Sequence, residues 1–171
     1  MHPIFLGDSY DIVKRFFSGV LRSLGYAVYV DPMLSGSWGK SEKTFYRFLG
    51  VEHVRVSCET GEKRALFVDP DTGVSGRATD KHVSFAQLAQ HCHDFQLVFA
   101  FDQSFSRARN PKEQMQSKLT QLSALGCSGC YYDSHARFIF ISRELQMLTE
   151  LRKALVDMGL PKTRLFPQAS T

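Results

Sequence analysis

The sequence predicts an α/β domain of three layers, α/β/α and Rossmann-like, with a mostly parallel sheet and a C-terminal antiparallel hairpin. Short apolar runs alternate along the chain with segments whose apolar residues recur at helical spacing, as in strands that alternate with covering helices. These runs are apolar at nearly every position, which is typical of parallel strands buried on both faces. The last two runs are separated only by residues 133–136, which favours a hairpin.

Residues 9–24 are predicted to form the first helix. Asp8 or Ser9 can cap its N-terminus, and Gly25 ends it. Its apolar stripe consists of Ile12, Val13, Phe16, Phe17, Val20, Leu21 and Leu24. Asp8, Asp11 and Lys14 share another face, where carboxylates complement the helix dipole, so we expect a solvated helix start there.

Residues 26–30 form a continuous apolar run that ends at Asp31, which predicts a buried strand. The stretch that follows is less regular. We expect a glycine- and serine-containing loop over 34–40, a short helix over 44–49 and an edge strand over 52–58.

The second half of the chain alternates more clearly. The predicted strands cover 65–68, 97–101, 130–132 and 137–141. The predicted helices cover about 84–93, 111–125 and 144–158. Residues 73–81 are polar with two glycines and are predicted to be an exposed loop. We expect the strands over 26–30, 65–68 and 97–101 to be parallel neighbours in one sheet.

The length and composition are those of one globular domain. The chain has 171 residues, of which 43% are hydrophobic and 22% charged, enough for a core of its own. We expect a single domain over 1–166 and a flexible tail over 167–171. No apolar run approaches the roughly 18 residues of a membrane helix, and the first residues lack the features of a signal peptide. We therefore expect a cytoplasmic protein with no membrane partner; the oligomeric state stays open.

Four predicted strands are each followed by an aspartate: Asp31, Asp69, Asp102 and Asp133. The carboxyl ends of parallel strands lie at one edge of a sheet, where ligands bind, so these carboxylates should converge there with Asp71. Like charges brought together cost stability unless a cation offsets them, and carboxylate oxygens suit Mg or Mn. We therefore predict Asp31, Asp69, Asp71 and Asp102 as metal ligands. Asp133 is left out because its hairpin strand can run either way. Aspartate also starts turns, so turn chemistry alone is the alternative.

The same edge carries candidates for catalysis and phosphate binding. Asp69, Asp71 and Asp102 are the predicted catalytic carboxylates. His135 is the candidate for a general base or a phosphate contact, and a turn histidine with no role is the alternative. The predicted phosphate-binding residues, just after the third buried strand, are Arg107, Arg109 and Lys112. Basic side chains beside a carboxylate–metal site are what a phosphate-bearing substrate requires. A solvated basic loop is the alternative.

The segment 69–73, Asp-Pro-Asp-Thr-Gly, resembles two known motifs. It is similar to the first motif of haloacid-dehalogenase-type phosphatases, with Thr72 and Gly73 in swapped order; that resemblance implies Asp69 as nucleophile and Asp71 as acid/base. It also resembles the acidic-proline motif after the fourth strand of class I methyltransferases. The order of elements after residue 65 is similar to the second half of that fold, which implies S-adenosylmethionine as methyl donor. The glycine-rich loop of that family should then follow the first strand, where this chain has residues 34–39.

The cysteines are predicted to be free thiols, as in a reducing compartment. Cys127 and Cys130 have the spacing of a zinc knuckle but lack a second well-spaced pair, so structural thiols are favoured over a zinc site.

The leading hypothesis is a metal-dependent enzyme that processes phosphoryl or phosphodiester groups, with nucleic acid as one substrate class and Mg or Mn as cofactor. The net charge of +4 permits such an anionic partner without marking a dedicated nucleic-acid module. One alternative is a class I methyltransferase-like protein, active or inactive. The other is a non-catalytic α/β interaction module whose strand-end aspartates only form turns.

Overall fold

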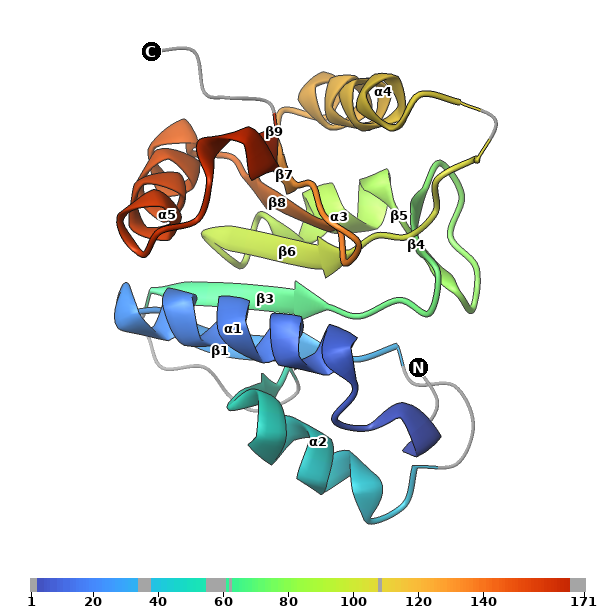
Figure 1. The fold of residues 1–171 in the computed structure, drawn as a ribbon, viewed down its shortest axis with the longest axis vertical. Helices are drawn as coiled ribbons and strands as arrows, with labels where there is room; N and C mark the ends of the chain where they lie inside the picture. Colours follow the sequence, from blue (N-terminus) through green and yellow to red (C-terminus); the bar gives the residue numbers. More distant parts are fainter. Residues whose placement is uncertain (1–2, 34–37, 55–60, 62, 108, 167–171) are drawn as a thin grey trace.

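The computed structural model describes residues 3–33, 38–54, 61, 63–107 and 109–166. They form a main sheet of seven strands with helices on both faces and a small second sheet of two strands (Figure 1). The helices are α1 (Ser9–Ser23), α2 (Ser41–Leu49), α3 (Phe85–His91), α4 (Pro111–Ala124) and α5 (Leu145–Asp157). The strands of the main sheet are β1 (Ala27–Asp31), β2 (Glu52–His53), β3 (Arg64–Val68), β6 (Leu97–Phe101), β7 (Ser128–Tyr132), β8 (Phe138–Ser142) and β9 (Leu165–Phe166). Short 3-10 turns lie at Pro3–Phe5 and Lys162–Arg164.

The strand order in the sheet is β2-β1-β3-β6-β8-β7-β9. β1 pairs in parallel with β2 and β3, and β3 pairs in parallel with β6. β8 runs antiparallel between β6 and β7. The predicted parallel neighbours and the C-terminal hairpin are therefore confirmed, as is the three-layer Rossmann-like class. Because β8 is reversed, β7 runs in the same direction as β6.

Each face of the sheet has its own apolar cluster. Side chains of α1, α2 and α5 pack on one face, around Phe17, Phe45 and Leu151. Side chains of α3 and α4 pack on the other, around Leu88 and Met115. The strands are buried on both sides, which is why their sequences are apolar without alternation.

Two regions differ from the predictions. Residues 73–81 were predicted to be an exposed loop, but they begin with β4 (Gly73–Ser75), which pairs in parallel with β5 (His82–Ser84) as a separate two-stranded sheet. The loop prediction failed at residues 73–75 because Val74 is the only buried apolar side chain in a polar run. The predicted edge strand over 52–58 is represented by β2; residues 55–60 lie outside the described part.

Among the described residues, no helix combines the length and the apolar character needed to cross a bilayer.

Candidate functional site at the carboxyl edge of the sheet

The strand-end aspartates alternate between the two faces of the sheet. Asp31 lies level with Val68 in β3, and Val68 lies level with Ala100 in β6. Asp69 therefore lies one residue further along the strand direction than Asp31, and Asp102 lies one residue further than Asp69. Since successive side chains of a strand point to opposite faces, neighbouring aspartates are turned away from each other. The predicted convergence of Asp31, Asp69 and Asp102 on one cleft is not what the structure has.

Asp69 belongs to a buried polar cluster on the side of α1 and α2. The Lys14 ammonium donates to Asp69 Oδ2 at 2.9 Å and to Asp11 Oδ1 at 3.0 Å. Asp11 Oδ2 also accepts the backbone N–H of Gly7 at 2.9 Å. The ammonium lies 5.5 Å from the ring centre of Phe101, within the range of a cation–π contact. All three charged side chains are buried.

Two carboxylates face the Lys14 ammonium in this cluster, and the positive N-terminus also acts on Asp69. Burial lowers the pKa of Lys14, but the attraction of Asp69 and then of Asp11 outweighs it, so that pKa lies above its ordinary value. Burial raises the pKa of the Asp69 carboxyl, and Asp11 raises it further, against the opposing effect of Lys14. Lys14 is thus held firmly in its charged form, and it provides the cation that the sequence had assigned to a metal.

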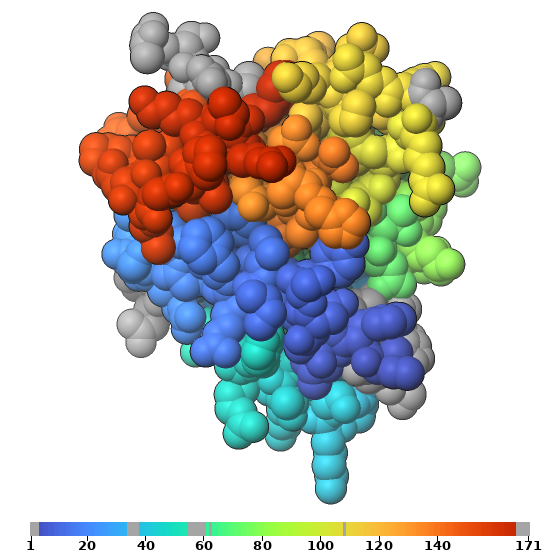
Figure 2. All heavy atoms as spheres, viewed as in Figure 1, coloured from blue at the N-terminus to red at the C-terminus, as the bar shows by residue number. Residues whose placement is uncertain are grey.

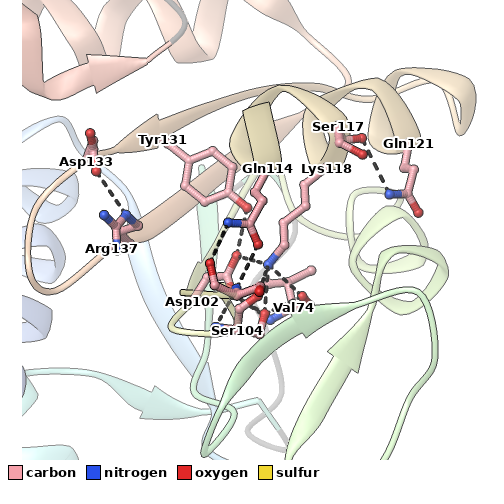
Figure 3. A network of polar contacts seen from close by, with 11 residues as sticks. Val74, Asp102, Ser104, Gln114, Ser117, Lys118, Gln121, Tyr131, Asp133 and Arg137 are labelled. Carbon is pink, nitrogen blue, oxygen red and sulfur yellow. Dashed lines mark hydrogen bonds and ion pairs between the residues drawn. The ribbon is translucent and has the colours of Figure 1, made fainter. Parts of the chain in front are cut away.

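Asp102 belongs to a second cluster on the side of α3 and α4 (Figure 3). Lys118 reaches down from α4 and donates to Asp102 Oδ2 at 2.7 Å, to Ser104 Oγ at 2.7 Å and to the Val74 carbonyl at 2.9 Å. The Tyr131 hydroxyl donates to Asp102 Oδ2 at 2.8 Å. The Val74 N–H donates to Asp102 Oδ1 at 2.9 Å. The carboxylate therefore ties β4, β6, β7 and α4 together.

The second cluster has one lysine facing one carboxylate, and the pKa of this lysine shifts in the opposite direction to that of Lys14. Burial lowers the pKa of Lys118 more than Asp102 raises it, and Arg137 lowers it further. Burial also raises the pKa of Tyr131 well above its ordinary value, and the Asp102 charge acts in the same direction. Tyr131 therefore stays a neutral hydroxyl that donates to the carboxylate.

Gly73 allows β4 to approach this carboxylate. Its φ is +136°, and a Cβ there would lie 2.8 Å from the Gln103 nitrogen and against Asp102 Oδ1. No other residue fits this backbone position without a shift of the chain. The space that the missing side chain leaves is taken by Asp102.

A hollow of about 600 Å³ lies beside the second cluster, between β4 and α4. Ser104 and Lys118 line its inner end, and Arg109 and Glu113 are among its charged lining residues. Gln114 holds the adjoining loop, since its side chain accepts the Ser106 N–H at 2.8 Å. Of the predicted phosphate-binding residues, only Arg109 lines the hollow. Arg107 and Lys112 are exposed outside it.

The remaining predicted residues lie at the same edge but apart from the two clusters. Asp133 pairs with Arg137 at 2.9 Å, and it lies at this edge because β7 runs parallel to β6. His135 is exposed, and its Nε2 lies 2.8 Å from the Tyr10 hydroxyl. Asp71 is half-buried in the turn before β4. Asp31 is half-buried. No hydrogen bond or ion pair joins its carboxylate to another described residue, but its charge acts on His91, where it opposes the lowering of the imidazole pKa by burial.

Within the described residues, no three His, Cys, Asp or Glu side chains gather as a group that could hold a metal ion. Asp69 and Asp102 each have a lysine ammonium at 2.9 Å or less, on opposite faces of the sheet. The described residues therefore do not fit the predicted four-aspartate metal site.

Several residues of these clusters were missed in the sequence. Asp11 and Lys14 were expected at a solvated helix start, but both are buried. A signal was present, because Lys14 precedes Phe17 by three residues and Leu21 by seven and so shares their buried face. Tyr131 gave no such signal, and Lys118 was grouped only with the basic residues that follow the third buried strand. Lys118 lies on the buried face of α4 between Met115 and Leu122, where a long stem can pack.

Comparison of the chain with models of protein families, with curated proteins and with solved structures found no match to any of them. The strand order and the side-chain geometry are therefore the observations that bear on function.

Proposed function

We propose that this domain is of the class I methyltransferase type and binds an adenosine-containing ligand, S-adenosylmethionine in the first place. One observation carries the proposal: β8 enters the sheet in reverse between β6 and β7. The last strand of class I methyltransferases is inserted in the same way, next to the strand that follows the acidic-proline motif. Here Asp69-Pro70-Asp71 follows β3, and β6 is its neighbour. Fold alone does not fix function, so the site must be tested directly.

The crevice between the carboxyl ends of β1 and β3 is the best place for the ligand. From β1 the chain goes to β2 on one side, and later to β3 and β6 on the other. The connecting helices α2 and α3 pack on opposite faces of the sheet. Ligands of open α/β sheets bind outside the strand ends at such a switch point.

Asp31 is the residue that would hold the ligand. Among the described residues, the strand-end carboxylates of Asp69, Asp102 and Asp133 are each ion-paired with a basic side chain, whereas that of Asp31 is not. A carboxylate at the end of a strand beside the crevice accepts hydrogen bonds from ribose hydroxyls. The buried Lys14–Asp69 pair holds the neighbouring turn in place. S-adenosylmethionine, when bound, supplies an electrophilic methyl group.

Isothermal titration with S-adenosylmethionine and S-adenosylhomocysteine tests the proposal. We expect both to bind, and Asp31→Asn to weaken binding by about tenfold or more, as expected for hydrogen bonds to a charged acceptor. Asp133→Asn is the matched control, since Asp133 also follows a strand, but that strand is β7, which lies three strands from β3. It should change the affinity less than twofold. Absence of binding at millimolar ligand, or equal losses in the two variants, would refute the site.

A phosphate-processing function is a second candidate, because Arg109 lines the hollow of about 600 Å³ beside Asp102 and Lys118. A guanidinium in a polar recess is suited to a phosphate group. Its test is the binding of a nucleoside monophosphate with and without Mg²⁺ or Mn²⁺. Arg109→Ala should abolish binding and Arg107→Ala, on the same loop but outside the hollow, should leave it unchanged. An affinity that does not respond to Mg²⁺ or Mn²⁺ would remove the metal from this candidate.

A further inference from the structure

An apolar groove lies on the outer face of α1, which does not pack against the sheet. The groove has a volume of about 520 Å³, and α1 and Met158 line it. Ile12, Phe16 and Met158 line it with exposed fractions of 54%, 39% and 59%. The sequence had placed Ile12 and Phe16 in the buried stripe of this helix. Figure 2 shows α1 in blue, uncovered on this face between α5 in red and α2 in cyan.

Gly19 forms the low part of the groove. It lies inside α1 with ordinary helical backbone, where glycine is less favourable than almost any other residue. A Cβ at this position would meet only the tip of the flexible Arg22 side chain, at 4.0 Å. The fold therefore does not require a glycine here, and its effect is to leave α1 open to the close approach of another chain.

The charges that line the groove are both positive. Arg15 and Arg22 contribute to its lining, and no acidic side chain of the described residues does. The Arg15 guanidinium stacks over Phe48 at 5.1 Å, and that of Arg22 packs against Gly50. Both arginines are thus supported by α2 and set in place beside the groove. Charged residues set beside an apolar groove select partners of the opposite charge.

We propose that this groove receives an amphipathic helix of a partner protein, with an apolar ridge along the groove and Asp or Glu residues opposite Arg15 and Arg22. Ile12 to Ser23 covers about three helical turns, which suits a partner helix of about 12 residues. A second copy of this chain fits poorly, because pairing two α1 helices would bring the arginines of both copies together. A bilayer fits poorly because its surface is not a ridge that could fill the recess at Gly19.

The test selects helical peptides from a displayed library with the full chain as bait. We expect the enriched peptides to have apolar residues at i, i+4 and i+7 with flanking carboxylates. Their affinity is then measured by fluorescence anisotropy against variants. Gly19→Leu fills the recess and should weaken binding at least tenfold, although it raises or preserves the melting temperature because leucine is a better helix former. Gly19→Ala gains the same propensity without filling the groove and should keep most of the affinity.

Charge reversal completes the test. Arg22→Glu should weaken the acidic peptides at least tenfold and favour versions of them with lysine in place of glutamate. The proposal is overturned if no helical peptide is enriched, or if the selected peptides bind Gly19→Leu as well as wild type. It is also overturned if sedimentation shows a dimer that Gly19→Leu dissociates, or if vesicles of anionic lipid bind the chain through this face.

Discussion

Two buried lysines hold two strand-end aspartates on opposite faces of the same sheet, with different surroundings. Lys14 is shared by the carboxylates of Asp69 and Asp11, beside the ring of Phe101. Lys118 faces the single carboxylate of Asp102, and uncharged oxygens of Ser104 and Val74 complete its contacts. The first ammonium is closed off by helices, whereas the second lines a hollow.

The difference shows that the number of carboxylates around a buried lysine, and not burial alone, decides the direction in which its pKa shifts. With two carboxylates its pKa rises, and with one it falls because desolvation prevails. The Lys14 cluster is suited to a structural role, since its ammonium is held in the charged form. The Lys118 cluster can lose a proton more easily, and it lies where a ligand in the hollow would meet it.

Removal of Lys14 should have the largest effect. Lys14→Met would leave two carboxylates buried without a cation, and we expect a loss of about 3–5 kcal/mol in the free energy of unfolding, measured with urea at pH 7. Lys153→Met is the control, because Lys153 pairs with Asp157 on the surface, where its side chain is 76% exposed. That variant should lose less than about 0.5 kcal/mol.

If Lys14→Met does not fold, the double variant Lys14→Met/Asp69→Asn should recover part of the stability, since only one buried carboxylate then remains unpaired. If Lys14→Met alone loses less than about 1 kcal/mol in the free energy of unfolding, other groups compensate the charges of the two buried carboxylates.

Removal of Lys118 should have a smaller effect. After Lys118→Met, the Asp102 carboxylate still accepts hydrogen bonds from Tyr131, Ser104 and the Val74 N–H. We expect a loss of about 1–3 kcal/mol in the same urea experiment. The comparison between the two clusters fails if Lys118→Met proves more costly than Lys14→Met.

A single hydrogen bond to Asp102 can be tested with a matched pair of tyrosines. Tyr131→Phe removes the donor to Asp102 and should reduce stability by about 1 kcal/mol. Tyr132→Phe makes the same chemical change at the next position of β7, where the ring packs against Phe17 on the opposite face. The Tyr132→Phe variant should lose clearly less stability than Tyr131→Phe. Equal losses would show that Tyr131 contributes through ring packing rather than through its hydroxyl.

The sequence predicted the sheet but not the pairing of its charges. Continuous apolar runs and helical spacing were sufficient to predict the strands, the three parallel neighbours and the hairpin, because burial of each element is visible in its own sequence. The position of β8 between β6 and β7 was not predicted. The direction of a strand-end side chain depends on register between strands, and a shift of one residue turns it to the other face. Asp31, Asp69 and Asp102 differ by one step each, which no local pattern reveals. Lys14 is the exception, because its spacing of three residues to Phe17 places it on the buried face of α1.

The smallest effect is expected from pH, which changes the protonation of each cluster without removing a group. Because the pKa of Lys118 is lowered in the folded state, the unfolded chain binds more protons between that value and the ordinary lysine pKa of about 10.4. The stability of wild type relative to Lys118→Met should therefore rise with pH across this window.

Lys14 has the opposite sign. Its pKa is raised in the folded state, so its contribution is complete below about 10.4 and is lost as the pH rises through the raised value. The stability of wild type relative to Lys14→Met, or to the double variant, should be flat from pH 7 to about 10 and fall above it. Urea unfolding at intervals from pH 7 to 11 measures both differences. Parallel curves would show that the pKa values of the two lysines shift in the same direction, and the distinction between the two clusters would then be wrong.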